Sequence, residues 1–186
     1  MYHILAKYKL TSLHIMVVIL GLTGVFGKLI SLGTIHLVWY RMGIAFLSLA
    51  IFLAFKKQLF SVNKKDFLGI LGVGSLVTFH WLCFFESIKV STVSVAVVCL
   101  ATSSLFSAVI EPLFFKRKLL GYEVVMGVIV IIALGFVMGT ETQYFWGYFY
   151  GIMAALLGTL FTLFNAKYIK KVGAAQITMI EMLSGL

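Results

Sequence analysis

Four ionisable side chains stand within or at the ends of long apolar stretches, where a charge is unusual. Lys28 and Arg41 lie near the ends of the first two stretches, His80 lies inside the third, and Glu86 follows it by six residues. Charges inside a bilayer are costly and usually face a cavity, a partner or a transport pathway. Two cations at one cavity would bind a carboxylate or a phosphate, and the planar guanidinium of arginine suits a carboxylate.

Each of these residues also has a purely structural explanation. Lys28 can extend to the membrane interface, and Arg41 can pair with a lipid phosphate or with Glu86. His80 can donate to a backbone carbonyl of a neighbouring helix, which we prefer to a role in proton coupling. Trp81 can face lipid or stack on a substrate, and both options stay open. The predicted substrate-binding set is Lys28, Arg41, His80, Trp81 and Glu86.

The composition of the chain tells which kind of element positions these side chains. Of its 186 residues, 62% are apolar and 11% are charged, whereas a soluble domain is about 45–50% apolar and about 25% charged. The chain therefore belongs in a lipid bilayer, where about 20 residues per span allow six or seven helices. The net charge of +9 comes from small basic clusters between apolar stretches, so we predict no nucleic-acid partner.

Charge clusters and breaks at Gly or Ser divide the chain into six membrane helices and the start of a seventh. The predicted ranges are 12–30, 36–55, 67–88, 92–115, 122–138 and 145–165, and the seventh helix starts near Gln176. Segment 90–98 is rich in Val, Ser and Thr like a strand, but an open strand edge would leave backbone groups unpaired in lipid. The predicted fold class is an all-α polytopic membrane protein.

Basic residues occur in every second connection between these helices. They are Lys7 and Lys9, four lysines within 56–65, residues 116–118, and three lysines within 167–171. The positive-inside rule places these connections in the cytoplasm, together with the N-terminus. Trp39 and Trp146 fall at the opposite ends of their helices, as an interfacial aromatic belt requires. We predict a multi-pass protein of the cell inner membrane with a cytoplasmic N-terminus.

The sequence lacks the motifs of other chemistry. It contains no His/Glu zinc spacing, no phosphate-binding glycine loop and no Ser/His/Asp set, so we predict no enzyme, no cofactor and no metal. A stripe of small and polar residues runs through segment 92–115 and favours close helix packing, with a polar wall of a substrate path as the alternative. Its last member, Glu111, would be explained by an ion pair with residues 116–118. The stripe consists of Thr92, Ala96, Cys99, Ser103, Ser107 and Glu111.

Several short motifs are distributed along the whole chain. They are GLTGVFGK at 21–28, VWYR at 38–41, HW at 80–81, FFESIK at 84–89, the small-residue segment 91–104, residues 111–115, and Gly127 with Gly135. In these motifs the chain resembles EamA-type permeases of the drug/metabolite transporter superfamily. The resemblance implies ten helices in two five-helix repeats, of which the second is inverted. Residues 1–138 would form the first repeat, and residues 139–186 the start of the second, in an N-terminal fragment of a longer protein.

A shift of about 140 positions gives some internal support for a repeat, because it superposes Gly33 on Gly173 and Arg41 on Glu181.

The chain also departs from the family in two of its helices. Many relatives have a proline where it has Ser104, so the resemblance does not carry over a proline kink to helix 92–115. The small multidrug-resistance relatives exchange protons on a carboxylate in their first helix, but the first acidic residue here is Asp66, so that mechanism is not expected.

The resemblance and the composition together predict a membrane permease. It would move a small organic metabolite, such as an amino acid or another anion-bearing solute, by alternating access, with the substrate bound between the two repeats. The alternative is a structural or assembly subunit of a membrane complex that transports nothing. The expected partners are a small-molecule substrate and the lipid bilayer, and a dimer is compatible with both functions.

Overall fold

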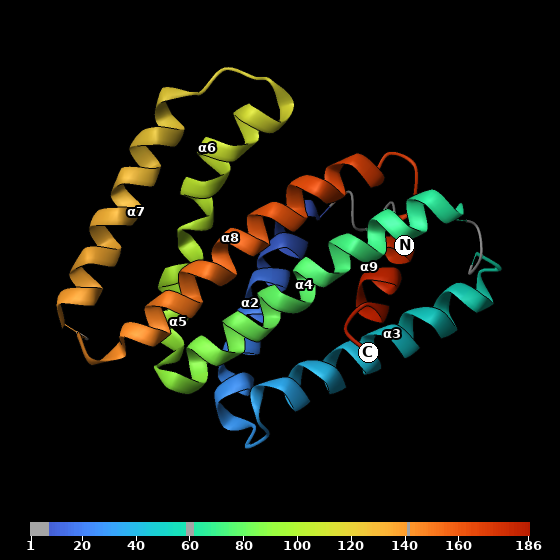
Figure 1. Cartoon of the computed structure of the whole chain (residues 1–186), viewed down its shortest axis with the longest axis horizontal. Coiled ribbons are helices and arrows are strands. Elements are labelled where there is room, and N and C mark those ends of the chain that lie inside the picture. The colour runs from blue at the N-terminus through green and yellow to red at the C-terminus, as the bar shows by residue number, and fades with distance from the viewer. Residues whose placement is uncertain (1–7, 59–61, 141) are drawn as a thin grey trace.

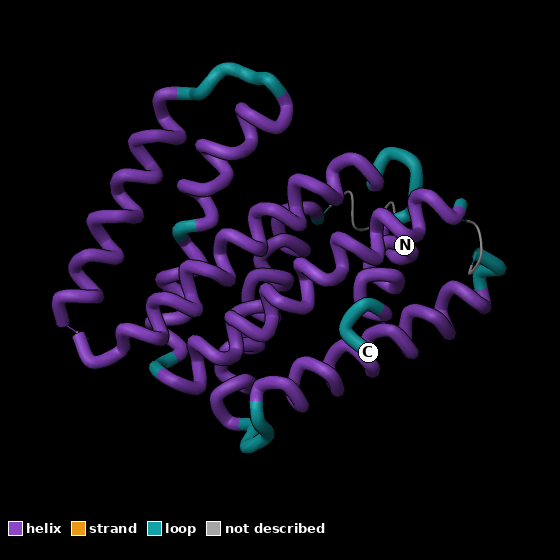
Figure 2. Tube along the Cα trace, viewed as in Figure 1, coloured by secondary structure: helices purple, strands orange, loops and turns teal. Residues whose placement is uncertain are grey.

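The computed structural model of the chain describes residues 8–58, 62–140 and 142–186. Lys7 of the predicted N-terminal cluster lies outside these ranges. Within them all regular structure is helical, as predicted, and six segments are long and apolar enough to cross a bilayer, with α5 and α6 together forming one of them. The elements are α2 (Lys9–Leu29), α3 (Thr34–Phe55), α4 (Lys64–Val90), α5 (Val93–Ala101), α6 (Ser103–Phe115), α7 (Gly121–Thr140), the 3-10 turn η1 (Thr142–Tyr144), α8 (Phe145–Tyr168) and α9 (Ala174–Leu183) (Figures 1 and 2).

Polar side chains cap the first turns of α4 and α5. At α4 the side chain of Asn63 accepts a hydrogen bond from the backbone N–H of Asp66 (2.8 Å), and Asp66 adds a negative charge to the first turn. At α5 the hydroxyl of Thr92 accepts from the N–H of Val95 (3.2 Å). Only two residues separate α4 from α5. The chain therefore turns back sharply at the end of α4, close to the predicted site residue Glu86.

The predicted helix 92–115 is interrupted at Thr102, so the expectation of one continuous helix was wrong. Both the backbone N–H and the hydroxyl of Thr102 donate to the carbonyl of Cys99, at 3.0 and 2.6 Å. A threonine side chain that takes a local carbonyl competes with the regular helix hydrogen bonds. The span therefore consists of two helices that meet without a proline. α5 packs against α8, and α6 forms a hairpin with α7 at one side of the molecule (Figure 1).

α4 and α8 lie side by side at the centre of the fold (Figure 1). α8 meets α4 and α5 at glycines, and at Gly151 an added Cβ atom would lie 2.5 Å from Cβ of Cys99 and 3.1 Å from Oγ of Ser87. The Ser87 hydroxyl donates a buried hydrogen bond to the carbonyl of Gly147 (2.7 Å). Two members of the predicted stripe, Ala96 and Cys99, are fully buried. Small residues here allow the close packing on which helix association in lipid depends.

Arg117 holds the connection between α6 and α7. Its Nε lies 3.4 Å from a carboxylate oxygen of Glu111, and a terminal nitrogen donates to Glu123 at 2.9 Å. The hydrogen bond to Glu123 is the main reason why the pKa of Arg117 is raised. The ion pair expected for Glu111 is therefore confirmed.

The predicted orientation can be tested with single cysteines at Asn63 and Thr142, which lie in connections of opposite type. We expect an impermeant thiol reagent added to intact cells to label Thr142→Cys and to spare Asn63→Cys, because the basic connection near Asn63 faces the cytoplasm. The native Cys83 and Cys99 set the background, which is measured in the parent protein. Labelling of position 63 without labelling of position 142 would show that the protein has the opposite orientation in the membrane.

Candidate functional site

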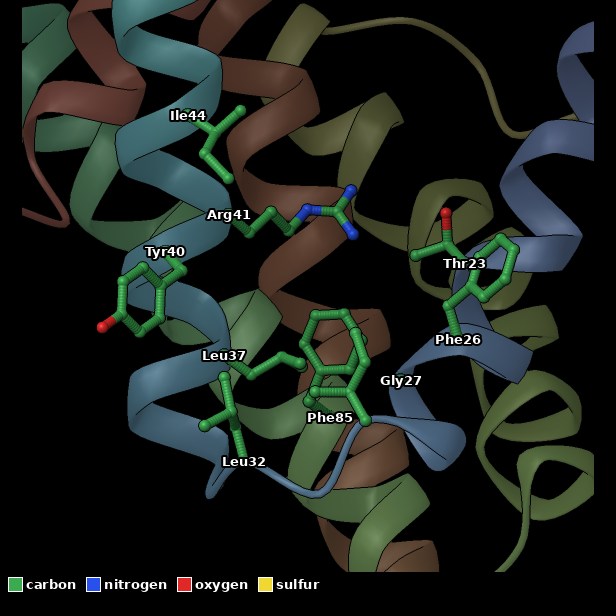
Figure 3. Close-up of a pocket in the computed structure, with 10 residues that line it drawn as sticks. Thr23, Phe26, Gly27, Leu32, Leu37, Tyr40, Arg41, Ile44 and Phe85 are labelled. Atoms are coloured by element: carbon green, nitrogen blue, oxygen red, sulfur yellow. The ribbon is translucent and has the colours of Figure 1, made fainter.

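A pocket of about 270 Å³ lies between α2 and α3 and reaches Phe85 of α4 (Figure 3). Its lining is mostly apolar, and Arg41 is the one charged residue among the described residues that line it. The Arg41 side chain extends from α3 toward Thr23 and Phe26 of α2 (Figure 3). The volume is near the lower end of the range for small-molecule sites, about 300–1,000 Å³. A small organic molecule with one charged group would therefore fit this pocket.

The guanidinium of Arg41 rests on aromatic rings of α4. Its central carbon lies 3.7 Å from the ring centroid of Trp81 and 5.7 Å from that of Phe85. Trp81 and Phe85 are four residues apart, so both rings lie on the same face of the helix. Such a contact stabilises a cation by about 0.5–2 kcal/mol, but it uses none of the N–H donors.

The ion pair with Glu86, one of the two structural alternatives considered for Arg41, is not formed in the described part of the chain. Among residues 8–58, 62–140 and 142–186, Arg41 has no hydrogen bond and no carboxylate within 4 Å. Glu86 instead accepts a hydrogen bond from the hydroxyl of Thr34 (2.5 Å) and lines a separate pocket of about 340 Å³ together with Tyr144 and Trp146. Thr34 satisfies the carboxylate because it starts α3 close to the end of α4. The Arg41 donors consequently remain available to a ligand.

Lys28 has a clear structural partner at the end of α4. Its Nζ donates to the carbonyls of Ile88 (2.9 Å) and Ser91 (2.7 Å). The last carbonyls of a helix have no acceptor role within it, so a cation at this end satisfies them and complements the helix dipole. Lys28 is not among the residues that line the Arg41 pocket. A contact between Lys28 and a substrate stays a prediction.

His80 joins α4 to α8. Its Nδ1 lies 2.7 Å from the carbonyl of Ala154, and since a carbonyl can only accept, Nδ1 donates. This confirms the backbone hydrogen bond that we preferred for His80. The imidazole also contacts Trp81, with ring centroids 5.1 Å apart, so His80 helps to hold the ring on which Arg41 rests. Of the predicted set, the structure thus brings together Arg41, Trp81 and His80.

Phe85 and Gly27 also line the pocket, although neither was predicted as a site residue. A Cβ atom on Gly27 would lie 2.5 Å from Cε1 of Phe85, so the glycine lets the phenylalanine approach α2. Both residues belong to motifs noted above, GLTGVFGK and FFESIK. The spacing of four between Trp81 and Phe85 was the available signal, because it places two aromatic rings on one helix face.

Comparison with known proteins agrees with the resemblance seen in the sequence. The sequence model of the EamA-like transporter family matches residues 9–139. A protein of Haemophilus influenzae named "Uncharacterized transporter" is 28% identical over 156 residues, which are 79% of this chain and 51% of that protein. The chain thus spans about half the length of the curated relative. No solved structure matches the chain.

Proposed function

Because the chain belongs to the EamA-like transporter family, we propose that it acts in a permease that carries a small organic solute with an anionic group. Amino acids and related carboxylates are the solute class that fits best. The proposed mechanism is alternating access within the cell inner membrane, with a cytoplasmic N-terminus, and without catalysis or a cofactor. The chain itself is a multi-pass membrane protein by its six apolar spans.

The observation that carries this proposal is the state of Arg41. A buried or half-buried charge normally has a counterion, since leaving it without one is costly in a low-dielectric environment. Arg41 has aromatic rings beneath it and, in the described part of the chain, no carboxylate beside it. An anionic substrate that enters the pocket would supply the missing counterion. A guanidinium presents parallel N–H donors, so it would bind a carboxylate through two hydrogen bonds.

The arrangement of the helices supports the proposed inverted repeats. α3 begins directly after Gly33 and α9 begins directly after Gly173, which is the same shift of 140 positions that relates their sequences. Each of these helices follows a long apolar helix after a short connection, and α3 and α9 pack against each other. A repeat with an odd number of spans enters the membrane from the opposite side, as alternating-access transporters with inverted repeats do.

Transport assays on Arg41 variants test the proposal. In vesicles that contain the permease in which the chain acts, we expect uptake of radiolabelled amino acids or organic acids to fall about tenfold in Arg41→Lys, which corresponds to about 1.4 kcal/mol. Lysine keeps the charge but loses the paired donors. Arg41→Gln should lose more. Uptake is compared at equal amounts of folded protein.

The matched control is Lys56→Gln, which removes an exposed cation at the end of the same helix. It should leave uptake unchanged. If the Arg41 variants lower the amount of folded protein but transport per folded molecule stays normal, Arg41 is a structural residue. The proposed anion site at Arg41 would then be wrong. A parent protein that takes up none of these solutes would instead favour the alternative of a subunit without transport activity.

A further inference from the structure

A second pocket, of about 290 Å³, lies between α8 and α9. Its polar lining consists of Thr162 and Asn165 on α8 and Thr178 and Glu181 on α9. Glu181 is only 5% exposed. Its carboxylate accepts a hydrogen bond from the side-chain amide nitrogen of Asn165 (2.6 Å). An ionised carboxylate buried in this way is costly unless a positive charge accompanies it.

That positive charge is not supplied by the part of the chain that the structure describes. The helices next to α9 are α3, α4 and α8. No described basic side chain on them forms an ion pair with Glu181 within 4 Å. The acidic residues of α4 are Asp66 and Glu86, and the latter is bound by Thr34. The basic and histidine side chains on these helices are His36, Arg41, Lys64, Lys65, His80, Lys89 and Lys167, and Lys56 directly follows α3.

Asn165, the partner of Glu181, also has a polar atom that is not satisfied in the described part of the chain. Its amide nitrogen is used by Glu181, while its amide oxygen, Oδ1, is buried and has no hydrogen-bond partner among the described residues. Buried polar atoms are almost always paired with protein, water or an ion, so this oxygen has room for a partner from outside the described residues. The missing partner of Asn165 is a donor or a cation.

The two threonines also present oxygen to the pocket. The hydroxyl of Thr162 donates to the carbonyl of Gly158 (2.8 Å), and that of Thr178 donates to the carbonyl of Ala174 (3.1 Å). Each hydroxyl hydrogen is therefore used within its own helix, and only oxygen lone pairs are left. Every polar side chain that lines this pocket thus offers an acceptor, which together with the carboxylate of Glu181 suits a cation.

We propose that the pocket between α8 and α9 binds a small monovalent cation, a proton or an alkali metal ion, at the carboxylate of Glu181 with Asn165 Oδ1 as a further ligand. One carboxylate balances one positive charge. Divalent ions usually take several carboxylates. Among the described residues, no three His, Cys, Asp or Glu side chains lie close enough together to hold a metal ion. The proposal concerns a site separate from the Arg41 pocket and does not depend on the proposed substrate.

The correspondence between the two helix hairpins agrees with this assignment. Arg41 of α3 and Glu181 of α9 occupy equivalent positions under the shift of 140, and each lines a pocket between its helix and the preceding one. The two pockets carry opposite charges. They are therefore expected to take different ligands, an anionic group at Arg41 and a cation at Glu181.

Thermal unfolding of the purified chain in detergent tests the cation site. A site for an alkali metal ion predicts that NaCl or KCl raises Tm by about 2–4 °C more than choline chloride at equal ionic strength. A site for a proton predicts no such difference, but a Tm that falls as the pH rises from 5 to 9, because the folded state then loses its bound proton. Both responses should disappear in Glu181→Gln, which keeps an acceptor for Asn165 but removes the charge.

Glu111→Gln is the matched control, because that carboxylate is only partly buried and is paired with Arg117. It should keep the response of the parent. Should Glu181→Gln fail to fold, Asn165→Leu replaces it and should weaken the alkali-ion response or move the pH response to higher pH, since the carboxylate loses its donor. A Tm that responds neither to Na⁺ or K⁺ nor, through Glu181, to pH would overturn the proposal and leave Glu181 as a contact that fastens α9 to α8.

Discussion

Gly151→Leu is expected to leave little folded protein, because α8 crosses α4 and α5 at this residue. An added Cβ atom would lie 2.5 Å from Cβ of Cys99 and 2.9 Å from its Sγ, and a leucine adds three further carbon atoms. Overpacking a tight contact costs about 1–3 kcal/mol and occasionally more. We expect a loss of about 3 kcal/mol or more, since the buried hydrogen bond from Ser87 to Gly147 would be pulled apart as well.

The measurement is the midpoint of unfolding of the purified protein in mixed detergent micelles. Gly72→Leu is the control, because nothing lies within 4 Å of a Cβ atom at that position of α4. Its midpoint of unfolding should lie close to that of the parent protein. Equal destabilisation by both substitutions would mean that leucine acts through the helix backbone or the lipid and not through the contact between α8 and α5.

A second pair of variants identifies the atoms involved. Gly151→Ala should already destabilise the protein, and Cys99→Gly should recover part of that loss by removing the atoms that the new methyl group meets. Residues in direct contact show interaction energies of about 0.5–3 kcal/mol in such double-mutant cycles. Independent effects of the two substitutions would contradict the geometry described for this crossing.

Lys28→Met should be the second most destabilising change, with a cost of about 2–4 kcal/mol. The lysine donates to the carbonyls of Ile88 and Ser91, and hydrogen bonds to charged groups contribute about 1.5–3 kcal/mol each. Methionine keeps the length of the apolar chain but leaves both carbonyls without this donor. We expect less folded protein with normal transport per folded molecule.

Lys65→Met serves as the control for Lys28, because it removes an exposed cation in the first turn of α4 and should change neither quantity. The two readouts separate the structural role of Lys28 from the predicted contact with a substrate. If Lys28→Met unfolds like the parent but loses transport, Lys28 belongs to the substrate site after all.

Hydropathy was sufficient to predict the helices, but not the interruption at Thr102. Apolar length and charged connections are local properties, and the six spans found in the structure follow them closely. A break in a helix depends on one side chain taking one carbonyl. Thr102 does this with Cys99, and threonine is common enough in membrane helices that its presence alone predicts nothing.

The candidate site was predictable in its residue types but not in its pairings. Arg41 and Trp81 were recognised as unusual residues in apolar stretches, and the backbone acceptor of His80 was expected. The partners of Glu86 and Lys28 were not, because Thr34 and the carbonyl of Ser91 lie 52 and 63 residues away in sequence. Contacts between residues so far apart in sequence form only when the helices pack, and a single sequence carries no signal for them.

The Lys28 contact also imposes an order on biogenesis. Lys28 is synthesised 60 residues before Ile88, and Ser87 is synthesised 60 residues before its acceptor Gly147. At about 5–20 residues per second, a ribosome needs about 3–12 s for each interval. During the first interval the ammonium group lacks the carbonyls of Ile88 and Ser91 and is best hydrated at the membrane surface, so we expect α2 to settle against its neighbours only when α4 is complete. We therefore expect α4 to pack against α2 first, and against α8 only after α8 has been synthesised.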